Sequence, residues 1–130
     1  MPQLLEEKSE ETYLRALLPA ACIQAELPGR ILIQPSYAVV FEVCANGRVF
    51  RLNAPISLVR YAENGYIYFE SKLFGIVACG QSPQIAADSF QEDFAVLWDE
   101  IAQQPDKLLT PEARKVKAEL LNVVNAVVAE

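Results

Sequence analysis

The sequence between residues 30 and 79 is divided into short β-type runs by turn-forming residues, and this division limits the folds open to the chain. The runs are rich in β-branched and aromatic residues, which favour strands. Two of the breaks contain Asn-Gly, at Asn46-Gly47 and Asn64-Gly65, a dipeptide typical of tight hairpin turns. The runs are Ile31–Ile33, Tyr37–Cys44, Val49–Leu52, Ile56–Tyr61, Tyr66–Glu70 and Ile76–Cys79. We therefore predict an antiparallel β-meander of five to six strands.

The periodicity becomes helical after Gly80. Ser82 followed by Pro83 is typical of a helix start, because serine caps the first turn and proline lacks only an N–H that would have no partner there. Apolar residues then recur at steps of four, four, three and four. They are Ala86, Phe90, Phe94, Leu97 and Ile101. We predict a helix over residues 82–104 with this face on the sheet.

A second helix is predicted over residues 111–128, because Thr110-Pro111 repeats the cap-plus-proline start. Its apolar stripe is wider than one packing seam requires. Such a stripe has two interpretations, packing on its own domain or contact with a partner protein. The candidate partner-binding residues are Val116, Leu120, Val123, Val124 and Val127.

These patterns predict an α+β fold in which two C-terminal helices pack on one face of the meander. A chain of 130 residues is the size of one domain. We place that domain at residues 30–130 and expect residues 1–29 to form a partly ordered N-terminal arm. There is no apolar run of membrane-spanning length, and residues 1–12 are acidic rather than signal-like. The expected location is therefore cytoplasmic, without membrane contact.

The charge balance favours a protein partner over a nucleic acid. The formal net charge is −6, and no cluster of lysine or arginine interrupts it. Because phosphate contacts carry most nucleic-acid affinity, direct binding of DNA or RNA is not expected. A basic protein is better suited to such a surface.

Several kinds of catalytic residue are missing from the sequence. There is no histidine, no phosphate-binding loop and no dinucleotide-binding glycine motif, so we expect neither enzymatic activity nor a cofactor. Cys22, Cys44 and Cys79 have no metal-binding spacing, and we expect them to be buried free thiols.

One catalytic alternative remains, a metal-dependent nuclease of the ribonuclease-H type. Its Mg²⁺ ligands would be Glu70, Asp88 and Glu92, because oxygen ligands suit that ion. The competing interpretation of Asp88 and Glu92 is a solvated helix face.

The segment from residue 65 to residue 101 carries a series of short motifs. They are Gly65-Tyr66 at a strand start, Leu73-Phe74-Gly75 at a turn, Gly80-Gln81-Ser82 before a helix, and Ala86 six residues after Gly80. This segment resembles the core of HicB-like antitoxin domains. The resemblance implies a reduced ribonuclease-H-like fold that lacks catalytic acids and binds a small basic toxin. We expect a non-catalytic domain that binds such a partner or associates with itself. A homo-oligomeric structural module without a toxin partner is a further alternative.

Overall fold

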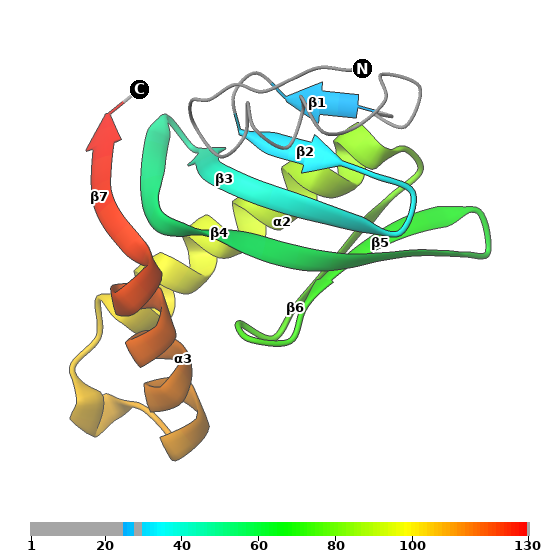
Figure 1. The fold of residues 1–130 in the computed structure, drawn as a ribbon. Coiled ribbons are helices and arrows are strands. Elements are labelled where there is room, and N and C mark those ends of the chain that lie inside the picture. The colour runs from blue at the N-terminus through cyan, green and yellow to red at the C-terminus, as the bar shows by residue number, and fades with distance from the viewer. Residues whose placement is uncertain (1–24, 28–29, 130) are drawn as a thin grey trace.

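The computed structural model describes residues 25–27 and 30–129, and it confirms the α+β meander. Six strands follow one another in chain order in an antiparallel sheet, and a seventh strand pairs with β4. Helix α2 runs along one face of this sheet (Figure 1). The elements are β1 (Ala25–Leu27), β2 (Ile31–Ile33), β3 (Tyr37–Ala45), β4 (Arg48–Glu63), β5 (Tyr66–Ser71), β6 (Ile76–Gly80), α2 (Pro83–Leu97), α3 (Pro111–Val123) and β7 (Val124–Ala129). Except for β1, the predicted N-terminal arm lies outside the described residues.

Both Asn-Gly pairs form hairpin turns as the sequence predicts. Asn46 and Gly47 have φ of 55° and 74°, and Asn64 and Gly65 have φ of 53° and 82°. The two-residue turns that match the twist of an antiparallel pair need positive φ, which Asn and Gly adopt most easily. These turns join β3 to β4 and β4 to β5.

Strand β4 is longer than predicted, because it joins the two runs that were expected to be separate strands. The segment 53–55, predicted as a break between them, lies inside a strand of 16 residues. The neighbouring strand β3 has a register shift at the same level, between Val40 and Glu42. There the N–H groups of Phe41 and Glu42 both donate to the carbonyl of Arg30, at 2.6 and 3.3 Å. On the other edge of β3, residues 52–55 of β4 lie opposite Phe41 alone, and β3 pairs with β4 on both sides of this irregularity.

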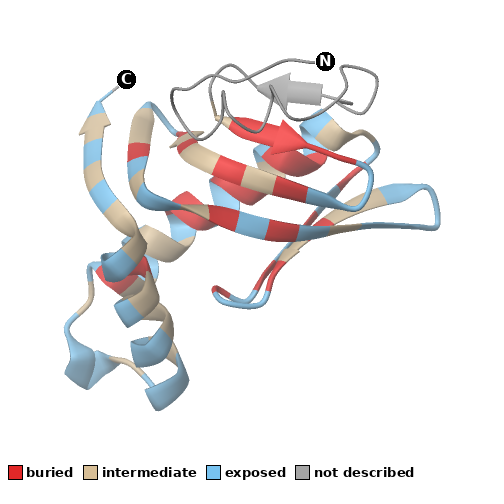
Figure 2. Cartoon of the chain, in the orientation of Figure 1, coloured by how far each residue is buried: buried red, intermediate tan, exposed pale blue. Residues whose placement is uncertain are grey.

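The core is an aromatic cluster between α2 and the sheet. The ring of Phe94 lies 5.6 Å from those of Phe50 and Phe74 in edge-to-face contact, and 6.1 Å from that of Phe90. All four side chains are essentially inaccessible to solvent. Figure 2 shows buried residues along α2 and alternating along the strands that face it. The predicted core face of this helix is therefore correct.

Helix α2 begins as expected and changes pitch near its end. The side chain of Ser82 accepts a hydrogen bond from the N–H of Ile85, with Pro83 in the first turn. After Leu97 the chain continues as one π-helical turn, Trp98–Ala102. In the part of the chain that the structure describes, no helix is long and apolar enough to span a membrane.

The C-terminal helix is shorter than predicted. Thr110 caps α3 through a hydrogen bond from the N–H of Ala113, but the helix ends at Val123 instead of Val128. The last residues form β7, which pairs with β4 from Arg48 to Leu52. The run VVNAVV is rich in valine, which packs well on a sheet and loses side-chain freedom in a helix. The edge of β4 is the pairing partner of this segment. The helical spacing of its valines gave no sign of that partner.

Candidate functional site

In the described part of the chain, one edge of β4 lacks a partner strand over its middle third. The residues from Arg48 to Leu52 pair with β7, and those from Val59 to Glu63 pair with β5. Between these two segments, residues 53–58 have no strand partner on that edge among the described residues. The sheet therefore contains an interruption between β7 and β5.

The direction of the backbone groups in this interruption follows from one hydrogen bond. The N–H of Arg60 donates to the carbonyl of Ser36 at 3.1 Å, on the side of β3. Successive residues of a strand direct their N–H and C=O groups to opposite edges. The N–H and C=O of Ser57, three residues away, therefore point to the open edge. Pro55 also lies there, where a missing N–H breaks no ladder bond.

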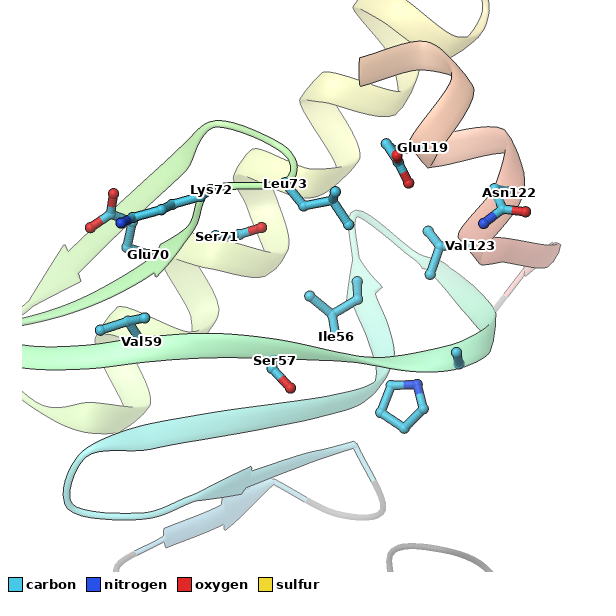
Figure 3. Close-up of a pocket in the computed structure, with 12 residues that line it drawn as sticks. Ile56, Ser57, Val59, Glu70, Ser71, Lys72, Leu73, Glu119, Asn122 and Val123 are labelled. Carbon is cyan, nitrogen blue, oxygen red and sulfur yellow. The ribbon is translucent and has the colours of Figure 1, made fainter. Parts of the chain in front are cut away.

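The interruption opens into a pocket of about 470 Å³. Ile56 of β4 forms its floor, Leu73 of the β5–β6 turn lies on one side, and Val123 at the end of α3 lies on the other (Figure 3). Polar groups surround this apolar centre. They are the side chains of Ser57, Glu70, Ser71, Lys72, Glu119 and Asn122. The pocket thus combines apolar walls with an unpaired strand edge.

Hydrogen bonds with β4 and with the loop before α3 hold this helix at the pocket. The amide of Asn53 donates to the carbonyl of Asn122 at 2.8 Å, which ties the end of the helix to β4. From the middle of the helix, the ammonium of Lys117 donates to the carbonyl of Gln104 at 2.6 Å and to the carboxylate of Asp106 at 2.8 Å. The Lys117 ammonium lowers the pKa of the Asp106 carboxyl. The helical wall of the pocket is therefore fixed relative to the sheet.

The chemistry of this pocket suits binding. The hydroxyl of Ser71 accepts a hydrogen bond from the N–H of Phe74 at 3.3 Å, so it supports the β5–β6 turn. A backbone N–H and C=O on an open edge, beside apolar walls, are the features by which proteins bind extended peptides. Glu70 and Glu119 outnumber Lys72 among the charged side chains that line it, which favours a basic ligand.

The five residues predicted to bind a partner do not form one exposed surface. Leu120 is fully buried in the core, while Val116, Val123 and Val124 are half-buried against it. Val127 is exposed, but it lies on β7 instead of a helix. Most of the wide stripe therefore packs on its own domain. Val123 is the member that also lines the pocket.

The three carboxylates of the nuclease alternative are not brought together. Glu70 lies on β5, whereas Asp88 and Glu92 are exposed on α2. Among the described residues, no three histidine, cysteine, aspartate or glutamate side chains are grouped as metal ligands would be. The geometry that this alternative required is absent from the described part of the chain.

The prediction for the cysteines was wrong at one position. Cys44 is half-buried, but the free thiol of Cys79 is exposed. Cys79 is exposed because alternate residues of β6 face away from α2. Cys22 lies outside the described residues.

Ser57 and Leu73 line the pocket, but the sequence did not identify either of them as a binding residue. The available signal was Pro55 within an otherwise β-type stretch, because proline in a strand indicates an unpaired edge. Comparison with family models, curated proteins and solved structures gave no match to this chain.

Proposed function

We propose that this chain is a non-catalytic protein-binding domain that holds an extended segment of a basic partner protein in the pocket of β4. The observation that carries the proposal is the interruption of the sheet beside Ser57. Unpaired ladder groups next to an apolar pocket offer both backbone hydrogen bonds and a site for a side chain. An extended peptide uses both of these features.

The dimensions of the interruption limit what can bind. It covers six residues, 53–58, and strands rise about 3.3 Å per residue. A segment of about four to six residues therefore fits along it. Ser57 would exchange two hydrogen bonds with one residue of that segment, and a neighbouring apolar side chain would enter between Leu73 and Val123.

Charge complementarity supports a basic partner. The net charge of the chain is −6, and Glu70 and Glu119 both line the pocket. A field of one sign increases the rate at which a partner of opposite sign arrives and disfavours partners of like sign. Two copies of this chain would repel each other, so a different protein is the better fit.

The resemblance to HicB-like antitoxins gives this proposal a biological form. The segment that carries it, residues 65–101, comprises β5, β6, α2 and the start of the π-helical turn. The chain would act as an antitoxin by masking a small basic toxin. In this proposal the pocket binds the partner, and no catalytic step is needed.

A selection of peptides tests the binding proposal. We expect random octapeptides displayed on phage and selected on the protein to converge on sequences with basic and β-branched residues. Leu73→Asp should abolish the enrichment, because it places a carboxylate in the apolar part of the pocket. Leu73 is 55% exposed, so the substitution leaves the core intact.

A matched control separates the pocket from general surface effects. Leu108 is 67% exposed and lies outside the pocket, so Leu108→Asp adds the same charge elsewhere. It should leave the selected peptides unchanged. The proposal would be contradicted if wild type and Leu73→Asp selected the same peptides, or if the selected peptides were acidic. Light scattering that showed the chain binding only itself would also contradict it.

A further inference from the structure

The face of the sheet opposite α2 carries exposed aromatic and aliphatic side chains. Alternation along the strands places on it Val59 and Val77, which are 52% and 53% exposed, and Tyr61, which is 37% exposed. Scattered exposed apolar residues are ordinary, but these lie on adjacent strands in register. Val59 pairs with Glu70, which pairs with Val77. They form one continuous strip of surface.

Two tyrosines stack on this surface near the turn between β4 and β5. Tyr61 on β4 is directly opposite Tyr68 on β5, with ring centroids 5.0 Å apart and planes inclined by 5°. We call this pair the tyrosine platform. Partial burial and the neighbouring groups Glu70, Tyr68 and Glu63 together raise the pKa of the Tyr61 hydroxyl. The Tyr61 hydroxyl therefore lies in a negative field.

Two carboxylates, those of Glu63 and Glu70, lie beside the platform. Glu63 pairs by register with Tyr66, and Glu70 pairs with Val59. Among the described residues, neither carboxylate forms an ion pair. Arg60 follows Val59 in the chain, but its guanidinium donates to the carbonyl of Gln34 at 2.8 Å. One face therefore carries the exposed ring of Tyr61 stacked on the half-buried ring of Tyr68, beside two carboxylates without an ion pair in the described part of the chain.

We propose that the tyrosine platform, with Glu63 and Glu70, binds an arginine side chain of the protein partner. A guanidinium is planar, so it stacks on aromatic rings and donates to carboxylates at the same time. A lysine ammonium cannot stack in this way, so the site selects arginine over lysine. This inference rests on the proposed function and specifies which residue of the basic partner is recognised.

The position of the platform fits the proposed route of the partner. Val59 and Glu70 line the pocket and also lie on the outer face beside the tyrosines. A segment held by Ser57 therefore reaches the platform within a few residues. A second copy of this chain is a poor occupant, because it would bring its own glutamates to the same surface.

Titration with short peptides tests the platform separately from the pocket. The probes are acetyl-Gly-Arg-Gly-amide, its lysine analogue and its citrulline analogue, which keeps the shape of arginine without the charge. Amide shifts in ¹⁵N–¹H spectra should concentrate at Tyr61, Tyr68 and Glu70 with the arginine peptide. The affinity of the lysine peptide should be at least about threefold lower than that of the arginine peptide. The citrulline peptide should give no shifts, as expected for an exposed cation–π site.

Two variants show whether the aromatic rings and the charge are both required. Tyr68→Leu should weaken binding of the arginine peptide about threefold or more, whereas Tyr61→Phe, which retains the ring, should keep it. Glu63→Gln should weaken it as well, and Glu100→Gln, an exposed carboxylate on the π-helical turn, should not. Equal affinity for arginine and citrulline would overturn the platform. Shifts confined to Ser57, Leu73 and Val123 would also overturn it, while leaving the pocket proposal standing.

Discussion

The two faces of the sheet are built from the same strands but differ in how far they are buried. On the inner face, Phe50, Phe69 and Phe94 are fully buried between the strands and α2. On the outer face, Val59 and Val77 are more than half exposed, and two tyrosines stack without a covering element among the described residues. Alternation along each strand produces both faces at once. The inner face therefore accounts for stability, and the outer face and the β4 edge remain available for binding.

The largest effect of a substitution is expected at the centre of the inner face. Phe94→Ala removes a ring that contacts three others, so it should lower the free energy of unfolding by about 3–5 kcal/mol. Urea denaturation measures this change. Val96→Ala on the exposed side of the same helix is the control and should change it by less than about 0.5 kcal/mol. A similar loss in both variants would mean that the two sides of α2 are misassigned.

A smaller effect is expected where the inner face meets the first turn of α2. A Cβ atom on Gly80 would lie 2.5 Å from Cγ2 of Ile85 and 2.7 Å from the backbone nitrogen of Ala86. Gly80→Ala should therefore destabilise by about 1–3 kcal/mol, as overpacking does. Cys79→Ala, one residue earlier but on the outer face, should be close to neutral. If the two variants had the same melting temperature, the contrast between the packed inner face and the exposed outer face would be contradicted.

A weaker and pH-dependent effect is expected from the ion pair that fixes the π-helical turn to the sheet. The guanidinium of Arg48 donates to both carboxylate oxygens of Asp99, at 2.8 and 2.9 Å, and these hydrogen bonds lower the pKa of Asp99. A carboxylate with a lowered folded pKa stabilises the fold above its unfolded pKa of about 3.9 and loses that contribution as pH falls through the folded value. Because the pair is partly exposed, its contribution is at most about 1 kcal/mol.

Asp99→Asn measures this contribution directly. The variant should be less stable than wild type at pH 7 and should approach wild-type stability as the pH is lowered below about 4. Added salt should also reduce the difference. A difference that stays constant from pH 7 to pH 2 would show that the ion pair is not its source.

The smallest effect is expected on the outer face. Val59→Thr keeps the β-branched shape and changes only an exposed surface, so the free energy of unfolding should change by less than about 0.5 kcal/mol. Peptide binding should nevertheless weaken, because Val59 lines the pocket. A large loss of stability in urea would indicate that this face is covered in the folded protein.

Local patterns in the sequence were sufficient for most of the fold. Asn-Gly fixed two hairpins, and the cap-plus-proline starts located α2 and α3. These signals act within a few residues, so they can be interpreted without knowing the rest of the chain. The apolar spacing of α2 also identified Phe90 and Phe94 as core residues.

Pairing between distant segments could not be predicted in this way. The valines after residue 123 fit helical spacing as well as a strand, and the choice depends on the edge of β4, more than 70 residues earlier in the chain. The interruption beside Ser57 arises because β7 and β5 take only the two ends of that edge. The pocket therefore follows from tertiary pairing, and Pro55 was its one local sign.

Native-state hydrogen exchange at two adjacent amides tests the central claim most directly. The N–H of Leu58 faces β3, whereas that of Ser57 faces the open edge. We predict that Ser57 exchanges at least about a hundredfold faster than Leu58, since only one of them is in a ladder hydrogen bond. A bound octapeptide should then slow Ser57 alone. Equal protection of the two amides in the free protein would contradict the open edge, and with it the proposed binding site.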